Sequence, residues 1–392
     1  MRLEVKRPDH IVPSYSLTGD LLSYLRCRLQ YRYHSGSALP PSRPVQLWFG
    51  EFLHGTLELA FRFWEESGGV YPFPWPCNQR EWRATAPEWK KNDIGRFADI
   101  VESSLRQQGK QARSREARNS GFRRVEAIVN NLGPHLFPLI AAAEKKVIGT
   151  RAVPVSERMI RCSNYEVHGI IDVLTNVTLG QVEEANLIRD CVREACPDLK
   201  GEYEVIVDYK GSERPLIEFD KKSYWEQGDW QVQTYAWLRS RQPDALPVAA
   251  GILIYTNELT PGDREMVNLK RGIKENKTEV LPLLGSNDEQ ITRMWKPGNS
   301  TDQLSLDFRL RRAIRVIPIT YESTQRALLA FDDVVKLIEE DIAEEAQSGN
   351  ILIAWSPSCK DDGTCAACDF RHFCPRPSGA EDNYVPSTPS AP

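Results

Sequence analysis

Apolar residues recur at helical spacing in several stretches of the chain, and each stretch predicts an amphipathic helix. Thr18 is a suitable N-cap for the first of them, Cys27 falls inside it, and His54 lies in the first half of the second. A further region is also expected to be helical and includes a basic stretch. The predicted helices occupy 18–34, 47–66, 93–146, 223–240 and 322–346.

Runs of apolar, β-branched and aromatic residues predict strands at 150–160, 165–175, 203–209, 249–256 and 313–320. The run 249–256 is apolar on both faces, so we expect a sheet that is covered by helices on both sides. Polar residues with Gly and Pro are typical of loops. They predict loops or insertions at 68–92, 176–202 and 257–300, and a disordered tail at 376–392.

Composition places this α/β pattern among ordinary globular proteins. The 392 residues are 41% hydrophobic and 27% charged, with a formal net charge of −4. These values exclude a collagen-like, wholly disordered or acidic-tail protein. No apolar run approaches the ~18 residues that a membrane span needs, and the N-terminus has no apolar signal region. We therefore expect a cytoplasmic protein with no membrane association.

The slightly acidic average conceals one strongly basic segment. Residues 106–124 contain seven Lys or Arg and one Glu, a local net charge of +6. A solvated helix face is the ordinary interpretation, but such a patch also suits a nucleic-acid surface. A second basic run, 309–315, is another candidate phosphate contact. Four tryptophans offer rings for unpaired bases, although packing is expected for most: Trp64, Trp75, Trp82 and Trp89.

Two acids stand in strands, where Asp is depleted. Asp172 interrupts the apolar run GIIDVL, and Asp208 ends VIVD two residues before Lys210. Residues two apart in a strand face the same side, so Asp208 and Lys210 point into one site that Asp172 can reach from a neighbouring strand. Two carboxylates beside a Lys suit Mg²⁺ or Mn²⁺. An ordinary salt bridge at a strand end is the competing interpretation, because D-x-K is frequent by chance.

Three further features accompany this acidic pair. Gly169 precedes Asp172 in a G-x-x-D pattern. Gln231 and Tyr235 lie one turn apart on the helix that follows Lys210. His54 stands in G-x-x-x-H on the second predicted helix. A lone His there is most often structural, but within this ordered set it is a candidate metal ligand.

The ordered set GEFLHG (50–55), GIID (169–172), VDYK (207–210) and QVQTY (231–235) resembles the RecB-type branch of the PD-(D/E)XK nuclease superfamily. The resemblance implies a restriction-endonuclease-like fold, with a mixed central sheet flanked by helices. It also implies a site in which His54, Asp172, Asp208 and the main-chain carbonyl of Tyr209 bind metal. By the same resemblance Lys210 is catalytic, and Gln231 and Tyr235 complete the site and position DNA.

One spacing departs from that family. Thirty-five residues separate Asp172 from Asp208, where the family usually has a short hairpin. The intervening segment therefore leaves alternatives for one of the two acids, namely Glu183, Glu184 and Glu204.

Nine cysteines raise a second chemical question. Without an export signal a disulfide framework is not expected. Four of the nine fall at the C-terminal end, in the pattern C-x5-C-x2-C-x5-C-P: Cys359, Cys365, Cys368 and Cys374. A C-x2-C pair in such a cluster is typical of zinc or iron–sulfur sites. Either Cys359 or the distant Cys27 can supply the fourth thiolate.

The segment YLRCRLQYRY around Cys27 resembles the N-terminal Cys motif of AddB-type recombination nucleases and CRISPR-associated Fe–S exonucleases. The resemblance implies a [4Fe–4S] cluster that joins the two ends of the chain, with Cys359 left over. Its ligands would be Cys27, Cys365, Cys368 and Cys374. A structural zinc site is the alternative, and the remaining cysteines are interpreted as ordinary ones.

The expected protein is thus a Mg²⁺- or Mn²⁺-dependent deoxyribonuclease, an exonuclease on single strands or DNA ends. We expect one nuclease domain at 1–375 with a helical insertion at about 68–146 and a C-terminal Fe–S staple. Its pathway would be recombination repair, CRISPR spacer acquisition or other phage defence. The chain lacks a G-x-x-x-x-G-K-[ST] loop, so a helicase or CRISPR integrase would be a separate partner. The alternative is a catalytically idle DNA-end-binding scaffold subunit.

Overall fold

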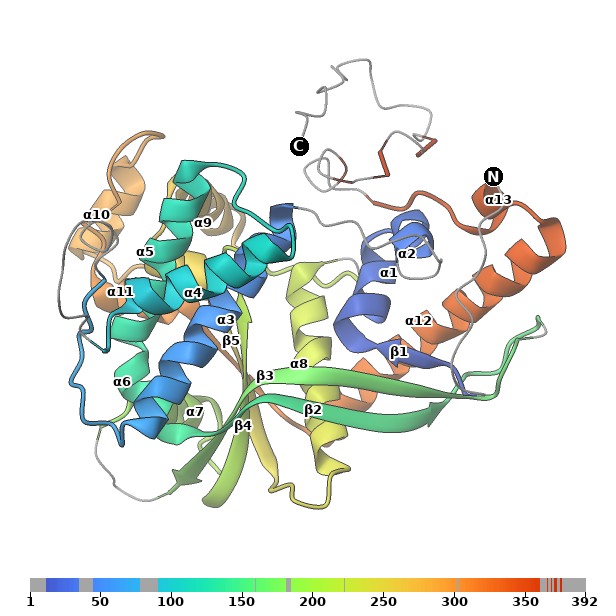
Figure 1. The fold of residues 1–392 in the computed structure, drawn as a ribbon, viewed down its shortest axis with the longest axis horizontal. Coiled ribbons are helices and arrows are strands. Elements are labelled where there is room, and N and C mark those ends of the chain that lie inside the picture. The colour runs from blue at the N-terminus through green and yellow to red at the C-terminus, as the bar shows by residue number, and fades with distance from the viewer. Residues whose placement is uncertain are drawn as a thin grey trace.

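A six-stranded mixed sheet forms the centre of the fold (Figure 1). The structure is a computed structural model that describes residues 12–34, 45–77, 91–158, 160–180, 185–221, 223–301, 303–359, 365, 368, 370, 371, 374 and 375. The strands follow the order β1-β3-β4-β5-β6, and β2 pairs with β3 outside this path. Their bounds are Ser14–Ser16 (β1), Ile140–Ala152 (β2), Asn164–Leu179 (β3), Gly201–Lys210 (β4), Val248–Tyr255 (β5) and Ile314–Pro318 (β6).

Helices cover both faces of this sheet, as the apolar run in β5 predicts. One layer contains α3 (Val45–Glu66), α4 (Ile94–Gln107), α5 (Arg115–Asn131), the short α6 (Gly133–Leu136) with the 3₁₀ turn Phe137–Leu139, and α7 (Leu187–Ala195). The other contains α1 (Leu22–Arg26), α2 (Arg28–His34), α8 (Tyr224–Ser240), α12 (Tyr321–Ser348) and α13 (Ile351–Ala354). Alternation in β4 separates the two cores, because Val205 and Val207 pack in the first and Ile206 in the second.

The helices predicted around His54, at 223–240 and at 322–346 are confirmed as α3, α8 and α12. Strands predicted from 165, 203, 249 and 313 are confirmed as β3 to β6. Ser223 caps α8 by accepting a hydrogen bond from the amide of Glu226, and Thr320 caps α12 through Ser323. These segments have strong hydrophobic patterns and local caps, so tertiary contacts reinforce the local preference.

Three predicted elements were wrong in whole or in part. They are the helix at 18–34, the end of the helix at 93–146 and the strand at 150–160. The first helix is a π-helical turn (Leu17–Leu21) and two α-helices, interrupted by Cys27 in extended conformation (φ −161°, ψ 115°). Ser16, rather than Thr18, caps this turn. Residues 140–152 form strand β2, although IAAAEKK has high helix propensity and the strand was expected at 150–160. Antiparallel pairing with β3 from Ile140 to Ala152 overrides that propensity.

The region expected as loops at 257–300 instead contains helices. It holds a 3₁₀ turn (Thr256–Leu259), α9 (Asp263–Glu275) and α10 (Asn287–Met294), followed by α11 (Leu306–Ala313). These helices share a small core of their own, formed by Met266, Leu269, Trp295, Leu304 and Phe308. The helices are short and their apolar residues few, which explains why the sequence pattern was too weak to identify them.

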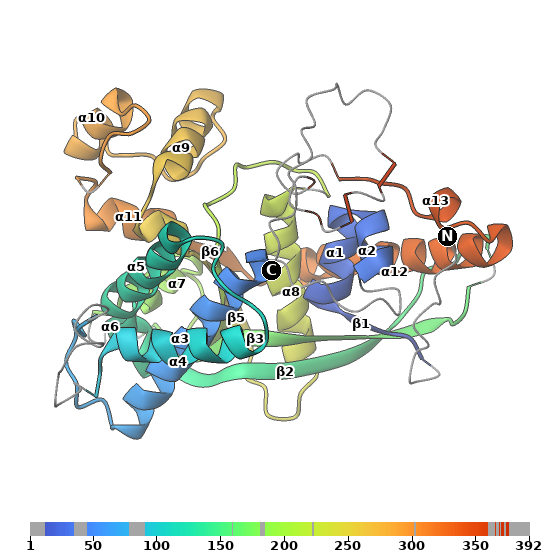
Figure 2. The ribbon, with the colours of Figure 1, turned by 45° about the horizontal axis from the view of Figure 1, so that its top comes forward.

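Figure 2 shows α1 and α2 beside α12, so the N-terminal segment lies against a helix from the C-terminal part of the chain. Buried contacts hold this pairing: Tyr24 donates to Asp341 at 2.7 Å, and Arg32 pairs with Glu345 at 2.6 Å. Among the helices that the structure describes, none has the length and hydropathy of a membrane span.

Candidate active site

Strand register places the two predicted acids side by side. β3 and β4 are antiparallel, and Val173 pairs with Val207, so the next positions along the two strands are Asp172 and Asp208. The same ladder continues to Leu179 and Gly201, and α7 lies in the connection. The 35-residue spacing is therefore a long hairpin with an inserted helix.

The alternative acids do not replace this pair in the described residues. Glu204 is buried and pairs with Arg239 at 2.7 Å, which commits it to the packing of α8 against β4. Glu183 and Glu184 lie outside the described residues.

A short chain of polar contacts joins β4 to α8. The Lys210 ammonium lies 2.7 Å from Asp208 Oδ2 and donates to Gln231 Oε1 at 2.5 Å. The Gln231 amide nitrogen in turn donates to Asp208 Oδ1 at 2.8 Å. Burial raises the pKa of Asp208, and the nearby Asp172 adds to this against the opposing effect of Lys210. Burial lowers the pKa of Lys210, but the charge of Asp208 outweighs burial and raises it overall. The raised pKa of Lys210 favours its charged form, and Asp208 and Gln231 hold the ammonium in place.

The glycine of the G-x-x-D pattern makes room for Tyr235. A Cβ at Gly169 would lie 2.5 Å from Tyr235 Cε1, a distance that no side chain tolerates. Tyr235 is itself buried, one turn beyond Gln231 on α8. Gly169 and Tyr235 thus fix how α8 packs over β3. This packing places Gln231 of α8 against Lys210.

His54 approaches the same acids from α3. Its Nδ1 lies 3.4 Å from Asp172 Oδ2, and its Nε2 lies 3.2 Å from the main-chain oxygen of Tyr209. Asp172 Oδ2 also accepts from the amide of Tyr209 at 2.9 Å. Burial lowers the pKa of His54, but Asp172, Asp208 and Glu144 outweigh burial and raise it to about 9. The imidazole therefore sits in a strongly negative environment.

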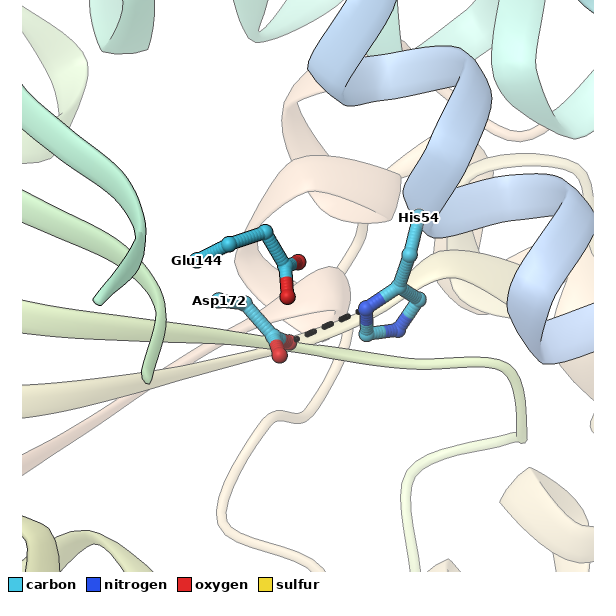
Figure 3. A group of neighbouring side chains, drawn as sticks. All are labelled: His54, Glu144 and Asp172. Carbon is cyan, nitrogen blue, oxygen red and sulfur yellow. Dashed lines mark ion pairs between the residues drawn. The ribbon is translucent and has the colours of Figure 1, made fainter. Parts of the chain in front are cut away.

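A third carboxylate, Glu144, was not predicted. In Figure 3 its side chain turns from β2 toward His54 and Asp172. Ala143 pairs with Val173 and Lys145 with Ile171, so Glu144 is opposite Asp172. Its backbone has φ of 51°, which is uncommon for a residue other than glycine. His54, Glu144 and Asp172 each offer a ligand atom within 4.8 Å of the others. Glu144 could have been identified as a site residue only if 140–152 had been recognised as a strand.

The donor set suits a hard divalent cation. Two carboxylates, from Asp172 and Glu144, one imidazole and the Tyr209 carbonyl converge here with no thiolate, a mixture that Mg²⁺ and Mn²⁺ accept. Asp208 lies outside this group, and its oxygens contact Lys210 and Gln231. A pocket with an empty volume of about 310 Å³ opens beside these groups. Its lining includes His54, Glu144 and Asp172, together with Glu58 and the apolar side chains of α3.

Residues 193–375 match the sequence model of the PD-(D/E)XK nuclease superfamily. The match includes Asp208, Lys210, Gln231 and Tyr235, whereas His54 and Asp172 precede it. A mixed six-stranded sheet flanked by helices is consistent with the restriction-endonuclease-like fold of that superfamily. No curated protein matches the chain.

The matched segment also contains the C-terminal cysteines. Burial raises the pKa of the Cys365 thiol to about 12, and Cys359, Cys27 and Cys368 add to this in that order. Cys359 and Cys365 are thus neighbours, whereas no three sulfurs of the described cysteines lie within 4.8 Å of one another. Cys374 is near enough to Tyr33 to contribute to the raised pKa of that phenol, after burial. Cys359, which was expected to lie outside the ligand set, raises the pKa of Cys365 more than Cys27 or Cys368 does.

Hydrogen bonding and packing join the same two segments of chain. The amide of Arg28, next to Cys27, donates to Ser358 Oγ at 3.1 Å. Tyr33 packs against Phe370 with ring centroids 5.2 Å apart. The other cysteines behave as ordinary ones: Cys196 donates to the carbonyl of Ala249, and burial raises the pKa of Cys191 to about 11.

Most of the predicted basic patch is neutralised by acids on neighbouring helices. Arg118 contacts Asp99 at 3.0 Å and Glu102 at 2.7 Å, and Lys110 contacts Glu51. Exposed arginines with no ion pair to a described residue remain at Arg113, Arg115 and Arg123.

The second basic run, 309–315, serves packing rather than phosphate binding. Arg312 and Arg315 are buried and pair with Glu258 and Asp229. Of the four tryptophans, Trp75 stacks on Phe73 in the core and Trp64 packs on Phe61. Trp82 and Trp89 lie outside the described residues.

Proposed function

We propose that this chain is a metal-dependent deoxyribonuclease that hydrolyses phosphodiester bonds. The observation that carries the proposal is the assembly of Asp172, Asp208, Lys210 and Gln231 by β3, β4 and α8. The superfamily match supports a nuclease and a DNA substrate. Acids and an imidazole line one pocket, and Lys210 contacts Asp208 on the adjacent strand β4; these are the groups that phosphodiester hydrolysis needs.

In this proposal Mg²⁺ or Mn²⁺ is held by His54, Asp172, Asp208 and the Tyr209 carbonyl, with Glu144 beside them. When bound, a divalent cation there polarises the phosphate and makes a water molecule more acidic. The His54 ring binds as the neutral imidazole, so cation binding displaces the proton that the surrounding acids favour. Asp172 also receives the Tyr209 amide, which fixes the orientation of its carboxylate.

Lys210 supplies the positive charge that faces the reacting phosphate. Its partners, Asp208 and Gln231, restrain the ammonium before substrate arrives, so little reorganisation is needed in the transition state. Gln231 is a positioning residue, because it contacts both Lys210 and Asp208. Tyr235 positions α8 against Gly169.

We further propose a [4Fe–4S] cluster bound by Cys27, Cys365, Cys368 and Cys374. Its support is the spacing of the cysteines and the Arg28–Ser358 hydrogen bond, which holds the residue after Cys27 beside the residue before Cys359. Thiolates suit iron–sulfur clusters and zinc alike. Anaerobic purification followed by iron and sulfide analysis, with absorbance near ~400 nm, tests the cluster. Stoichiometric zinc without iron would replace it with a zinc site.

The RecB- and AddB-type resemblance extends the proposal to exonuclease action on single strands or DNA ends. The chain would work in recombination repair, CRISPR spacer acquisition or another phage-defence system, beside a helicase or integrase partner. Cleavage of end-labelled single strands, blunt duplexes and closed circles tests end dependence directly. Cutting of closed circles at the same rate as linear strands would exclude exonuclease action.

Lys210→Ala tests the catalytic proposal. With Mn²⁺ and single-stranded DNA, we expect its cleavage rate to fall at least about a hundredfold, because a preorganised charge at the phosphate is lost. DNA binding and the melting temperature should change little. Lys336→Ala is the matched control, since this lysine makes an ion pair with Glu340 on α12, away from the site. Undiminished cleavage by Lys210→Ala would refute the assignment.

The scaffold alternative makes the opposite prediction for the wild type. A catalytically idle subunit would bind DNA ends but release no nucleotides with Mg²⁺ or Mn²⁺, under conditions in which the metal is shown to bind. The intact set of Asp172, Asp208 and Lys210 favours the enzyme.

A further inference from the structure

Two exposed aromatic side chains lie where the chain passes from β4 into α8. Phe219 is 83% exposed and Tyr224 is 56% exposed. In the described part of the chain the remaining exposed aromatic is Tyr321, at 76%. Aromatic rings elsewhere in the described residues are at least partly buried, as in the cluster around Trp75. Two of these three exposed aromatic residues, Phe219 and Tyr224, therefore fall within six consecutive residues.

The segment that presents Phe219 is held on both sides. The amide of Ile217 donates to the carbonyl of Lys277 at 2.9 Å. Ser223 Oγ donates to the carbonyl of Glu218 at 2.6 Å, and the amide of Ser223 donates to the carbonyl of Asp220 at 2.7 Å. Hydrogen bonds thus hold main-chain groups on either side of Phe219, whose ring is exposed to solvent.

Helical geometry aligns Tyr224 with the active site. Tyr224 is the first residue of α8, and Gln231 and Tyr235 follow seven and eleven residues later. Those spacings place all three on one stripe of the helix. Seven residues rise about 10 Å along the axis, so Tyr224 stands about 10 Å from the residue that holds Lys210. In Figure 1, α8 crosses the sheet with this N-terminal end uppermost.

The charges around the two rings do not favour phosphate. Glu218, Asp220 and Glu226 are close to them in sequence. The nearby Lys277 and Lys221 are paired, with Glu218 at 3.2 Å and with Asp333 at 3.4 Å. An exposed ring in acidic surroundings can still bind the flat face of a nucleobase. Stacking would thus contribute the affinity here without counterion release.

We propose that Phe219 and Tyr224 form a stacking platform for unpaired bases of the strand that enters the active site. This inference rests on the proposed nuclease function and specifies its substrate as single-stranded DNA. Base pairs in a duplex already stack on each other, so a paired strand cannot offer base faces to these rings. The platform lies on the same stripe of α8 as Gln231, so a strand stacked on it would continue toward Lys210.

Binding measurements on the Phe219→Ala/Tyr224→Ala double variant test this platform. Fluorescence anisotropy with a labelled oligothymidylate of about 20 nucleotides, in EDTA to prevent cleavage, gives Kd. We expect Kd to rise at least about fivefold, as loss of base stacking predicts. The slope of log Kd against log salt should stay unchanged, because no phosphate contact is lost. Affinity for a blunt duplex should also be unchanged.

Two variants control for structural damage. Tyr321→Ala removes an equally exposed ring from the first position of α12, whose first turn contacts the other half of α8 through Thr324 and Gln233. It should leave Kd unchanged. Phe219→Trp keeps a stacking surface and should retain wild-type affinity. Equal thermal melting of all variants will show that the fold is preserved.

A double variant with Kd within about twofold of the wild type, or with an altered salt slope, would overturn the platform. So would a wild type that does not bind oligothymidylate. Failure of the nuclease proposal gives a different result: the wild type would bind oligothymidylate and lose affinity in the double variant, but cleave nothing with Mn²⁺. With an active enzyme, the double variant should raise KM for single strands and leave kcat unchanged.

Discussion

The active site and the cysteine end of the molecule both join residues that are distant in sequence, but protein contacts hold them to different extents. In the active site, strand register and the Gln231 contacts fix Asp208 and Lys210 before any metal binds. At the cysteine end, the main-chain bonds of Cys365, Cys368 and Arg371 stay within their own segment. Contacts that join it to the N-terminal segment include the Tyr33–Phe370 packing and the Arg28–Ser358 bond. The first site therefore has a geometry of its own, whereas the second depends more on what joins its sulfurs.

The largest expected effects come from one substitution in each site, with the melting temperatures of the two variants compared. Cys27→Ala should abolish the iron–sulfur absorbance and lower Tm by more than about 5 °C, because a cluster that joins two segments contributes its binding energy to folding. Asp208→Asn should abolish cleavage but lower Tm less than Cys27→Ala does. The amide keeps an acceptor for Gln231 and relieves the repulsion with Asp172, which offsets part of the lost ion pair with Lys210.

Cys77→Ala is the control for the first variant, because this cysteine packs with α3 and α4 away from the others. If Cys27→Ala and Cys77→Ala melt together with iron retained, the cysteine end does not depend on a cluster. A large drop in Tm for Asp208→Asn would instead show that the active site contributes to folding.

The same contrast explains how far the sequence could predict the molecule. Asp172, Asp208 and Lys210 were identifiable because a charged residue in an apolar strand contradicts local preference and so indicates a site. Their meeting depends on a register that spans an inserted helix, and the α7 insertion hid that register.

Glu144 could not be predicted because its segment has the local preference of a helix. Alanines and lysines at 141–146 favour a helix, and only pairing with β3 makes the segment a strand. The interruption of the first helix at Cys27 was missed for the same reason. The basic runs were visible in the sequence, but their neutralising acids, such as Glu102 and Glu258, come from other elements. Local pattern thus predicts elements, while the partners of charged side chains depend on the tertiary fold.

A smaller effect, on metal affinity, tests whether Glu144 is a ligand in the preassembled active site. Glu144→Gln should weaken Mn²⁺ binding about tenfold by calorimetry, since loss of a charged ligand lowers the affinity of an oxygen-ligand site. Glu58→Gln is the matched control, because Glu58 lines the same pocket but pairs with Arg62. Glu144→Asp keeps the charge but shortens the side chain, so it separates ligation from long-range attraction. Wild-type affinity in Glu144→Gln would exclude Glu144 from the metal site.

The smallest effect concerns the hydrogen bond between the two ends of the chain. Ser358→Ala removes the acceptor of the Arg28 amide and should cost about 0.5–1.5 kcal/mol in the free energy of unfolding. Ser103→Ala, which removes only a bond within α4, is the control. Combining Ser358→Ala with Cys27→Ala makes a double-mutant cycle. If a cluster holds the ends together, the Ser358 bond should lose its contribution once Cys27 is gone, because the C-terminal segment no longer stays beside Arg28. Equal costs in both backgrounds would show that protein contacts alone dock the two ends, and the cysteine end would then resemble the active site in being preassembled.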